Sequence, residues 1–153
     1  MLPQREISMP AQNNPNEVGH VLIVDDHQPT ARLISTAFDE VSSGVSTHVV
    51  GDGSECLSVL RGETDSTPAP DIVLLDLGLP DVDGLTVLET RSEDQSLRQI
   101  PTIVLSGRDD AETIGKCYER GANTFISKPD EFDGYLTVAN AITDYWFSTA
   151  KLP

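Results

Sequence analysis

Five short apolar runs alternate with five helix-like patterns along this chain, and the alternation restricts the possible fold more than any other feature. The apolar runs, which we expect to be strands, are His20–Val24, Val45–Val50, Ile72–Leu75, Pro101–Leu105 and Thr124–Ser127. Repeated strand–helix units of this kind predict a parallel sheet with helices on both faces, joined by right-handed crossovers. We therefore expect an α/β, doubly wound (βα)5 fold with five parallel strands in the order 2-1-3-4-5.

The chain is predicted to form one domain with short ends. Its 153 residues suffice to bury a core without disulfides. Residues 1–18 contain three prolines among Gln and Asn, show no periodicity and are expected to be a flexible lead-in. The domain is expected over residues 19–147, with its last helix running through Trp146, and residues 148–153 are expected to form a tail.

Composition excludes several classes of protein. A net charge of −15 argues against direct nucleic-acid binding, which needs a basic surface. No apolar run approaches the roughly 18 residues of a membrane span, and the N-terminus lacks the apolar core of a signal peptide, so we expect a cytoplasmic protein without membrane contact. Cys56 and Cys117 lack metal-ligand or redox spacing and are expected to be reduced core thiols. The acidity also suggests the hypothesis of a surface adapted to a high-salt cytoplasm, the alternative being an ordinary acidic protein.

Four of the five predicted strands end in residues suited to phosphate or metal chemistry. These residues are Asp25 and Asp26 after the first strand, Asp76 after the third, Ser106 after the fourth and Lys128 after the fifth. In the order 2-1-3-4-5 the first and third strands are neighbours, so the side chains are expected to converge in one crevice. Taken alone, Asp76 could be a turn aspartate, Ser106 a strand-end hydroxyl and Lys128 a surface charge. The ordered set predicts a functional site.

The predicted crevice has the chemistry of a phosphoryl-transfer site. Three neighbouring carboxylates repel one another and call for a cation, and hard oxygen ligands beside phosphate suit Mg²⁺. Asp76 is then a candidate nucleophile, because carboxylates accept phosphoryl groups as acyl phosphates. Lys128 is expected to balance the added negative charge, and the Ser106 hydroxyl to donate to a phosphoryl oxygen. Gly107 has no side chain and leaves room for the phosphoryl group.

These motifs together resemble the receiver domain of two-component response regulators. The resemblance rests on Asp25-Asp26, on Leu-Leu-Asp-Leu-Gly-Leu-Pro-Asp-Val-Asp-Gly at residues 74–84, on Ser106-Gly107 and on Lys128-Pro129. It extends from about His20 through the last predicted helix. It implies a protein that accepts a phosphoryl group and signals through a change of conformation, with no enzymatic activity beyond its own phosphorylation and dephosphorylation.

The resemblance also implies roles for individual residues at the metal site. Asp76 would be the phospho-acceptor, and Asp25 and Asp26 would hold Mg²⁺ together with Asp76 and the backbone carbonyl of Gly78. Glycine is less usual at position 78, but a main-chain ligand tolerates any side chain there. Only the rate of dephosphorylation is then put in doubt.

Further implied roles concern switching and the segment after the fifth strand. Phosphorylation would pull the Ser106 hydroxyl inward, and the aromatic ring of Phe125 would turn into the space that it leaves. Taken alone, Phe125 could be a plain core aromatic. The Lys128–Pro129 peptide bond is expected to be cis by analogy with the family.

The C-terminal residues suggest which receiver proteins are most similar. The ending Tyr-Trp-Phe-Ser-Thr-Ala-Lys-Leu-Pro at residues 145–153 resembles the small stand-alone regulators paired with phytochrome-type histidine kinases. A sensor histidine kinase is therefore the expected partner. Three consecutive aromatic residues cannot share one helix face, so some are expected to be exposed or covered, either in a homodimer or on the kinase.

Two other functions share part of this pattern. A Mg²⁺-dependent aspartate-nucleophile phosphatase also combines Asp, Ser, Lys and Mg²⁺, but it places Asp-x-Asp after the first strand, whereas Asp25 and Asp26 are adjacent. A flavodoxin-like module that binds FMN has the same topology. Its phosphate loop should be rich in Ser, Thr and Gly, and here the corresponding residues are Asp25, Asp26 and His27, the last expected to be solvated.

Overall fold

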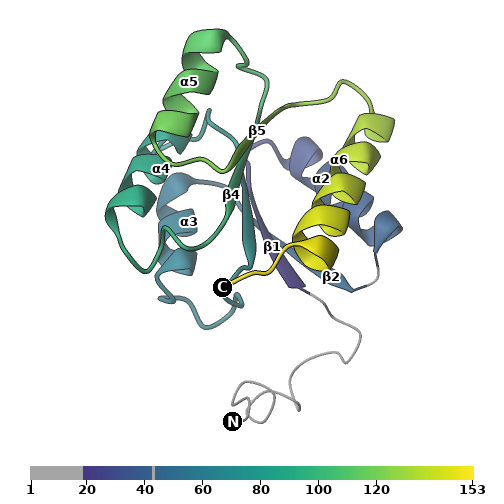
Figure 1. The fold of residues 1–153 in the computed structure, drawn as a ribbon, viewed down its shortest axis with the longest axis horizontal. Helices are drawn as coiled ribbons and strands as arrows, with labels where there is room; N and C mark the ends of the chain where they lie inside the picture. The colour runs from purple at the N-terminus through teal and green to yellow at the C-terminus, as the bar shows by residue number, and fades with distance from the viewer. Residues whose placement is uncertain (1–18, 43) are drawn as a thin grey trace.

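The computed structural model describes residues 19–42 and 44–153, in which five parallel strands form a sheet between two layers of helices (Figure 1). The order is β2-β1-β3-β4-β5, as predicted. The strands are β1 (Gly19–Val24), β2 (Val45–Val50), β3 (Ile72–Leu75), β4 (Thr102–Ser106) and β5 (Thr124–Ser127). The lead-in expected for residues 1–18 lies outside the described residues.

Helices cover the two faces of the sheet unequally. One face carries α2 (Gln28–Val41) and α6 (Phe132–Asp144), which pack against each other (Figure 1). The other face carries α3 (Gly53–Leu60), α4 (Gly84–Glu93) and α5 (Ala111–Glu119). A separate apolar cluster fills the space between the sheet and each helical layer.

Local sequence explains where strands and helices begin and end. All four residues of β3 are buried, as are Val21 to Val24 of β1, because both faces of these central strands are covered. Helices α3, α4 and α5 begin after Asp52, Asp83 and Asp110, whose carboxylates each accept the backbone N–H three residues later. These aspartates stabilise the helix starts at the carboxyl edge of the sheet, where the loops that surround the predicted crevice lie.

The last helix differs from the prediction that it continues through Trp146. Helix α6 ends at Asp144, and Tyr145–Thr149 form a π-helical turn, η1. The wider turn lets Trp146 and Phe147 pack against the cluster between the sheet and the α2–α6 layer, while Tyr145 stays exposed. The Phe147 ring lies so close to Gly19 that any side chain at position 19 would clash with it.

Both cysteines are free and buried, as expected for core thiols. Burial raises the pKa of the Cys56 thiol to about 12, so the reactive thiolate is scarce at neutral pH. Among residues 19–42 and 44–153, every helix is too short or too polar to cross a membrane.

Candidate functional site

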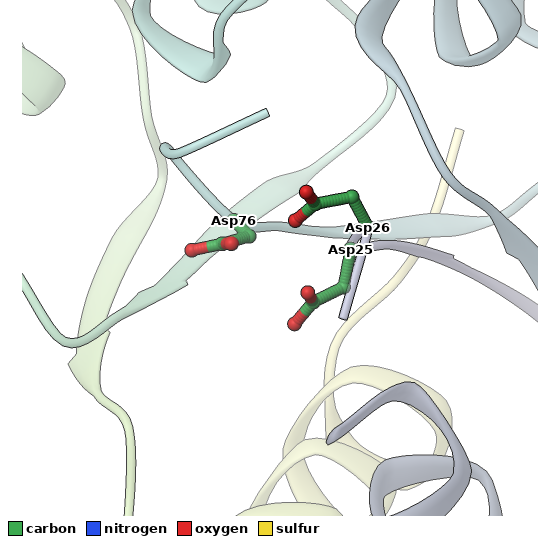
Figure 2. A group of neighbouring side chains, drawn as sticks. All are labelled: Asp25, Asp26 and Asp76. Carbon is green, nitrogen blue, oxygen red and sulfur yellow. The ribbon is translucent and has the colours of Figure 1, made fainter. Parts of the chain in front are cut away.

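Three carboxylates meet where β1 and β3 end. These strands are paired, with Val24 opposite Leu75, so Asp25 and Asp76 follow neighbouring positions in the sheet. One oxygen from each of Asp25, Asp26 and Asp76 lies within 4.8 Å of the others (Figure 2). Asp25 is buried, Asp76 is partly buried and Asp26 is exposed. The structure therefore shows the convergence that the strand order predicted.

Lys128 reaches the same crevice from the end of β5. Its ammonium nitrogen lies 2.9 Å from Asp25 Oδ2 and 3.5 Å from Asp76 Oδ2. The Lys128 side chain is one-fifth exposed, so both contacts are only partly screened by water. The lysine thus links the end of β5 to the ends of β1 and β3, although β4 lies between β3 and β5 in the sheet.

Backbone amides orient the two less exposed carboxylates. The N–H of His27 donates to Asp25 Oδ1 at 2.9 Å, and the N–H of Leu77 donates to Asp76 Oδ1 at 2.9 Å. Each of these carboxylates therefore has one oxygen held by the main chain and the other directed toward Lys128. The ring of His27 is exposed, as expected, and its Nδ1 lies 2.7 Å from Thr30 Oγ1.

The electrostatics of the crevice favour a cation. Burial raises the pKa of Asp76 above its ordinary value and the charge of Asp25 adds to the rise, while Lys128 opposes it. Burial favours the neutral amine of Lys128, but its hydrogen bond and attraction to Asp25 outweigh this, so its pKa is raised. Three ionised carboxylates and one ammonium sum to a charge of −2. A divalent cation with a preference for oxygen ligands fits this set of donors.

The loop after β3 packs closely against the start of α4 but is open at one position. A side chain at Gly84 would clash with the backbone of Asp76 and Leu77, so the start of α4 packs directly on this loop. Gly78 is exposed, and a Cβ there would meet no atom within 4 Å. The backbone at Gly78, two residues after Asp76, is therefore open to solvent.

Ser106 ends β4, and its buried hydroxyl is engaged by its own loop. Its Oγ accepts the N–H of Arg108 at 3.1 Å. Gly107 is exposed, and a Cβ there would meet no atom within 4 Å. Phe125 on β5 is partly buried against the cluster that faces α3, α4 and α5, and its N–H donates to the Tyr118 hydroxyl at 3.0 Å.

The expected cis bond between Lys128 and Pro129 is wrong, because no peptide bond among the described residues is cis. The trans form is the intrinsically favoured one for a prolyl bond. In this arrangement the Pro129 ring packs on Gly134 in the first turn of α6, where a side chain would clash with the ring. The Lys128 N–H still donates to the Ser106 carbonyl at 3.0 Å, which keeps the ends of β4 and β5 together.

Comparison with known proteins identifies the family. Residues 21–139 match the response regulator receiver domain. The chain belongs to this family. The receiver domain is 27% identical to response regulator Rcp1 of Synechocystis sp. over 147 residues, which are 95% of this chain and 99% of that protein.

Solved structures agree with the receiver domain in fold. A crystal structure of the phosphorylated cyanobacterial phytochrome response regulator RcpA is 32% identical, has a TM-score of 0.81 and is matched over 88% of this chain and 98% of its own. The Mn²⁺-bound form of Rcp1 is 26% identical, has a TM-score of 0.79 and is matched over 88% of this chain and 99% of its own. Receiver domains bind Mg²⁺ or Mn²⁺ in an acidic cluster, and Asp25, Asp26 and Asp76 form such a cluster here.

Some polar contacts of the receiver domain were not anticipated from the sequence. Arg91 on α4 is buried, and its guanidinium donates to main-chain carbonyls and to one side-chain amide. Asp109 and Ser127 form a hydrogen bond across the ends of β4 and β5. These residues are far apart in sequence, and only the order of the strands could have suggested that Asp109 and Ser127 lie near each other.

Proposed function

We propose that this receiver domain is a single-domain response regulator that accepts a phosphoryl group from a sensor histidine kinase on Asp76. The observation that supports this most strongly is the convergence of Asp25, Asp26 and Asp76 with the Lys128 ammonium at one edge of the sheet. In this proposal Asp25, Asp26, Asp76 and the Gly78 carbonyl hold Mg²⁺. In this proposal the domain comprises residues 19–147 and the tail residues 148–153, the first two of which belong to the η1 turn.

The proposed transfer uses the groups that the fold brings together. An oxygen of Asp76 attacks the phosphorus of a phosphohistidine, forming a P–O bond while the P–N bond breaks and the imidazole nitrogen leaves with the electron pair. Mg²⁺, when bound, offsets the negative charge shared by the carboxylates and the phosphoryl oxygens. The Lys128 ammonium, already 3.5 Å from Asp76 Oδ2, pairs with a phosphoryl oxygen.

In this proposal, switching follows because the Arg108 N–H and a phosphoryl oxygen on Asp76 compete for the Ser106 hydroxyl. Its Oγ accepts the N–H of Arg108 in the present structure, and donation of its hydroxyl to a phosphoryl oxygen draws the side chain toward Asp76. Phe125, partly buried on the neighbouring strand, turns into the space that Ser106 leaves. The change is read by another protein through surface contacts, without enzymatic turnover or direct nucleic-acid binding.

The partner proposed for this receiver is a phytochrome-type histidine kinase. Support comes from the similarity over nearly the whole chain to Rcp1 and RcpA, the latter described as a cyanobacterial phytochrome response regulator. We place the reaction in the cytoplasm, where the buried Cys56 and Cys117 remain reduced.

Incubation with acetyl phosphate, followed by intact-mass measurement, tests the proposed function. The protein is expected to gain the mass of one phosphoryl group with Mg²⁺ present and to gain none in excess EDTA. Hydroxylamine should then remove the added mass, because it cleaves acyl phosphates. Modification that is indifferent to EDTA, or that resists hydroxylamine, would argue against a metal-dependent aspartyl phosphate.

We further propose that the C-terminal aromatic residues mediate a homodimer. Tyr145 is 55% exposed, and its ring meets Trp146 edge-on, with centroids 5.1 Å apart. We expect Tyr145→Ala to shift sedimentation equilibrium from dimer to monomer, and Asn140→Ala, at an exposed position on α6, to leave it unchanged. A monomeric wild-type protein at all accessible concentrations would reject the homodimer.

The net charge of −15 supports the additional proposal that the protein is adapted to high salt. Raising KCl from about 0.1 M to about 1 M shortens the Debye length from about 10 Å to about 3 Å and weakens repulsion among surface carboxylates. We expect the melting temperature to rise over this range. Equal melting temperatures at the two concentrations would refute the proposal.

A further inference from the structure

The loop between β4 and α5 is held to the neighbouring strand by a contact outside the acidic crevice. Ser127 Oγ, at the end of β5, donates to Asp109 Oδ2 at 2.9 Å. Ser127 lies opposite Ser106 in the sheet, so this bond attaches the loop that follows Ser106 to the strand beside it. We refer to the hydrogen bond between Asp109 and Ser127 as the loop latch.

The strand order shows to which side of β4 the loop latch holds the loop. Strand β4 lies between β3 and β5. The loop after β4 can therefore lie closer to Asp76, which follows β3, or closer to Ser127, which ends β5. The hydrogen bond to Ser127 holds it on the β5 side.

A hydrogen bond connects this loop to the Ser106 hydroxyl. Ser106 Oγ accepts the N–H of Arg108, the residue directly before Asp109. If Ser106 moves toward a phosphoryl group on Asp76, it must either leave the Arg108 amide or take the loop with it. A loop that follows Ser106 toward β3 moves Asp109 away from Ser127, so the latch and the phosphorylated arrangement oppose each other.

We propose that Asp109 and Ser127 are positioning residues that favour the unphosphorylated position of Ser106. The inference rests on the proposed function, since it concerns how readily Ser106 reaches a phosphoryl group on Asp76. Both side chains of the latch are exposed, so the bond is a modest one and is suited to shifting an equilibrium. Loss of one such bond corresponds to a shift of about threefold to tenfold, since tenfold equals about 1.4 kcal/mol.

The test compares Ser127→Ala, which removes the donor, with Ser127→Thr, which retains a hydroxyl. Two measurements are made with Mg²⁺ present: the affinity for beryllofluoride, a mimic of the aspartyl phosphoryl group, followed through the NMR signals of Gly107 and Arg108, and the rate of modification by acetyl phosphate. Ser127→Ala is expected to bind beryllofluoride about threefold to tenfold more tightly and to be modified faster. Ser127→Thr should resemble the wild type.

Asp109→Ala should reproduce the effect of Ser127→Ala, and the double variant should show no further gain, because the two residues act through one bond. A merely structural bond would lower the urea midpoint and leave beryllofluoride affinity unchanged, which would overturn the latch. If the wild-type protein takes phosphate and the variants match it in beryllofluoride affinity and in the rate of modification, the loop latch is overturned and the proposed function stands. Wild-type protein that takes no phosphate overturns the proposed function and the latch with it.

Discussion

Replacing Asp76 by Asn is expected to abolish the gain of phosphate from acetyl phosphate and Mg²⁺. The amide removes the nucleophilic oxygen while keeping nearly the same size and shape, so the fold should be unaffected. Lys128 keeps its contact with Asp25 at 2.9 Å and is not left without a charged partner. The expected loss of modification is complete within the detection limit of intact-mass measurement, which makes this the largest predicted effect.

Asp39→Asn is a suitable control for this experiment. Asp39 is an exposed aspartate on α2, so its replacement changes the net charge by the same amount without touching the crevice. The control should gain phosphate at the wild-type rate. Phosphate on the Asp76→Asn protein, in the amount found for the wild type, would assign the acceptor to another residue.

Replacing Arg91 by Met is expected to lower the free energy of unfolding by about 3 kcal/mol. The Arg91 side chain is buried and donates to Ile100 O at 2.9 and 3.0 Å, to Gly121 O at 2.9 Å and to Asn123 Oδ1 at 3.1 Å. These contacts tie α4 to the segments that lead into β4 and β5. Methionine fills much of the volume but donates no hydrogen bond, so Gly121 O loses its Arg91 donor, and Ile100 O and Asn123 Oδ1 keep only their contacts with Thr102.

Urea unfolding measures this effect, with Arg61→Met as the control. Arg61 is exposed at the end of α3, and its replacement should change stability by no more than about 0.5 kcal/mol. Arg91→Lys should recover only part of the stability, because one ammonium cannot reach carbonyls on several segments at once. If Arg91→Met is as stable as the control, the guanidinium contacts make no net contribution.

The strands and the convergence of the acidic residues could be predicted because they depend on local pattern and simple topology. Buried runs such as Ile72–Leu75 mark central parallel strands, and the order of the strands then determines which strand ends meet. Asp25 and Asp76 were expected to be neighbours for this reason, and they are. The glycine after α5 was also predictable: Gly121 has φ +95°, a backbone conformation that glycine adopts readily.

Other features depend on contacts that local pattern does not reveal. Helix α6 is followed by a π-helical turn where a continued α-helix was expected, and Trp146 and Phe147 in this turn pack against the core. The Pro129 ring lies against Gly134, a contact that the local pattern does not reveal. In the sequence, Arg91 cannot be told from a surface arginine. The carbonyls that it contacts come from loops up to thirty residues away, so the local pattern does not reveal its burial.

The most direct test of the acidic convergence is anomalous diffraction from crystals soaked in Mn²⁺. We predict an anomalous peak between the ends of β1 and β3, with carboxylate oxygens of Asp76 and of Asp25 or Asp26 about 2 Å from the metal. The Gly78 carbonyl should be a further ligand. A peak that lies away from these carboxylates, or no peak at a saturating Mn²⁺ concentration, would contradict the proposal that the three aspartates form the metal site of a phosphoryl acceptor.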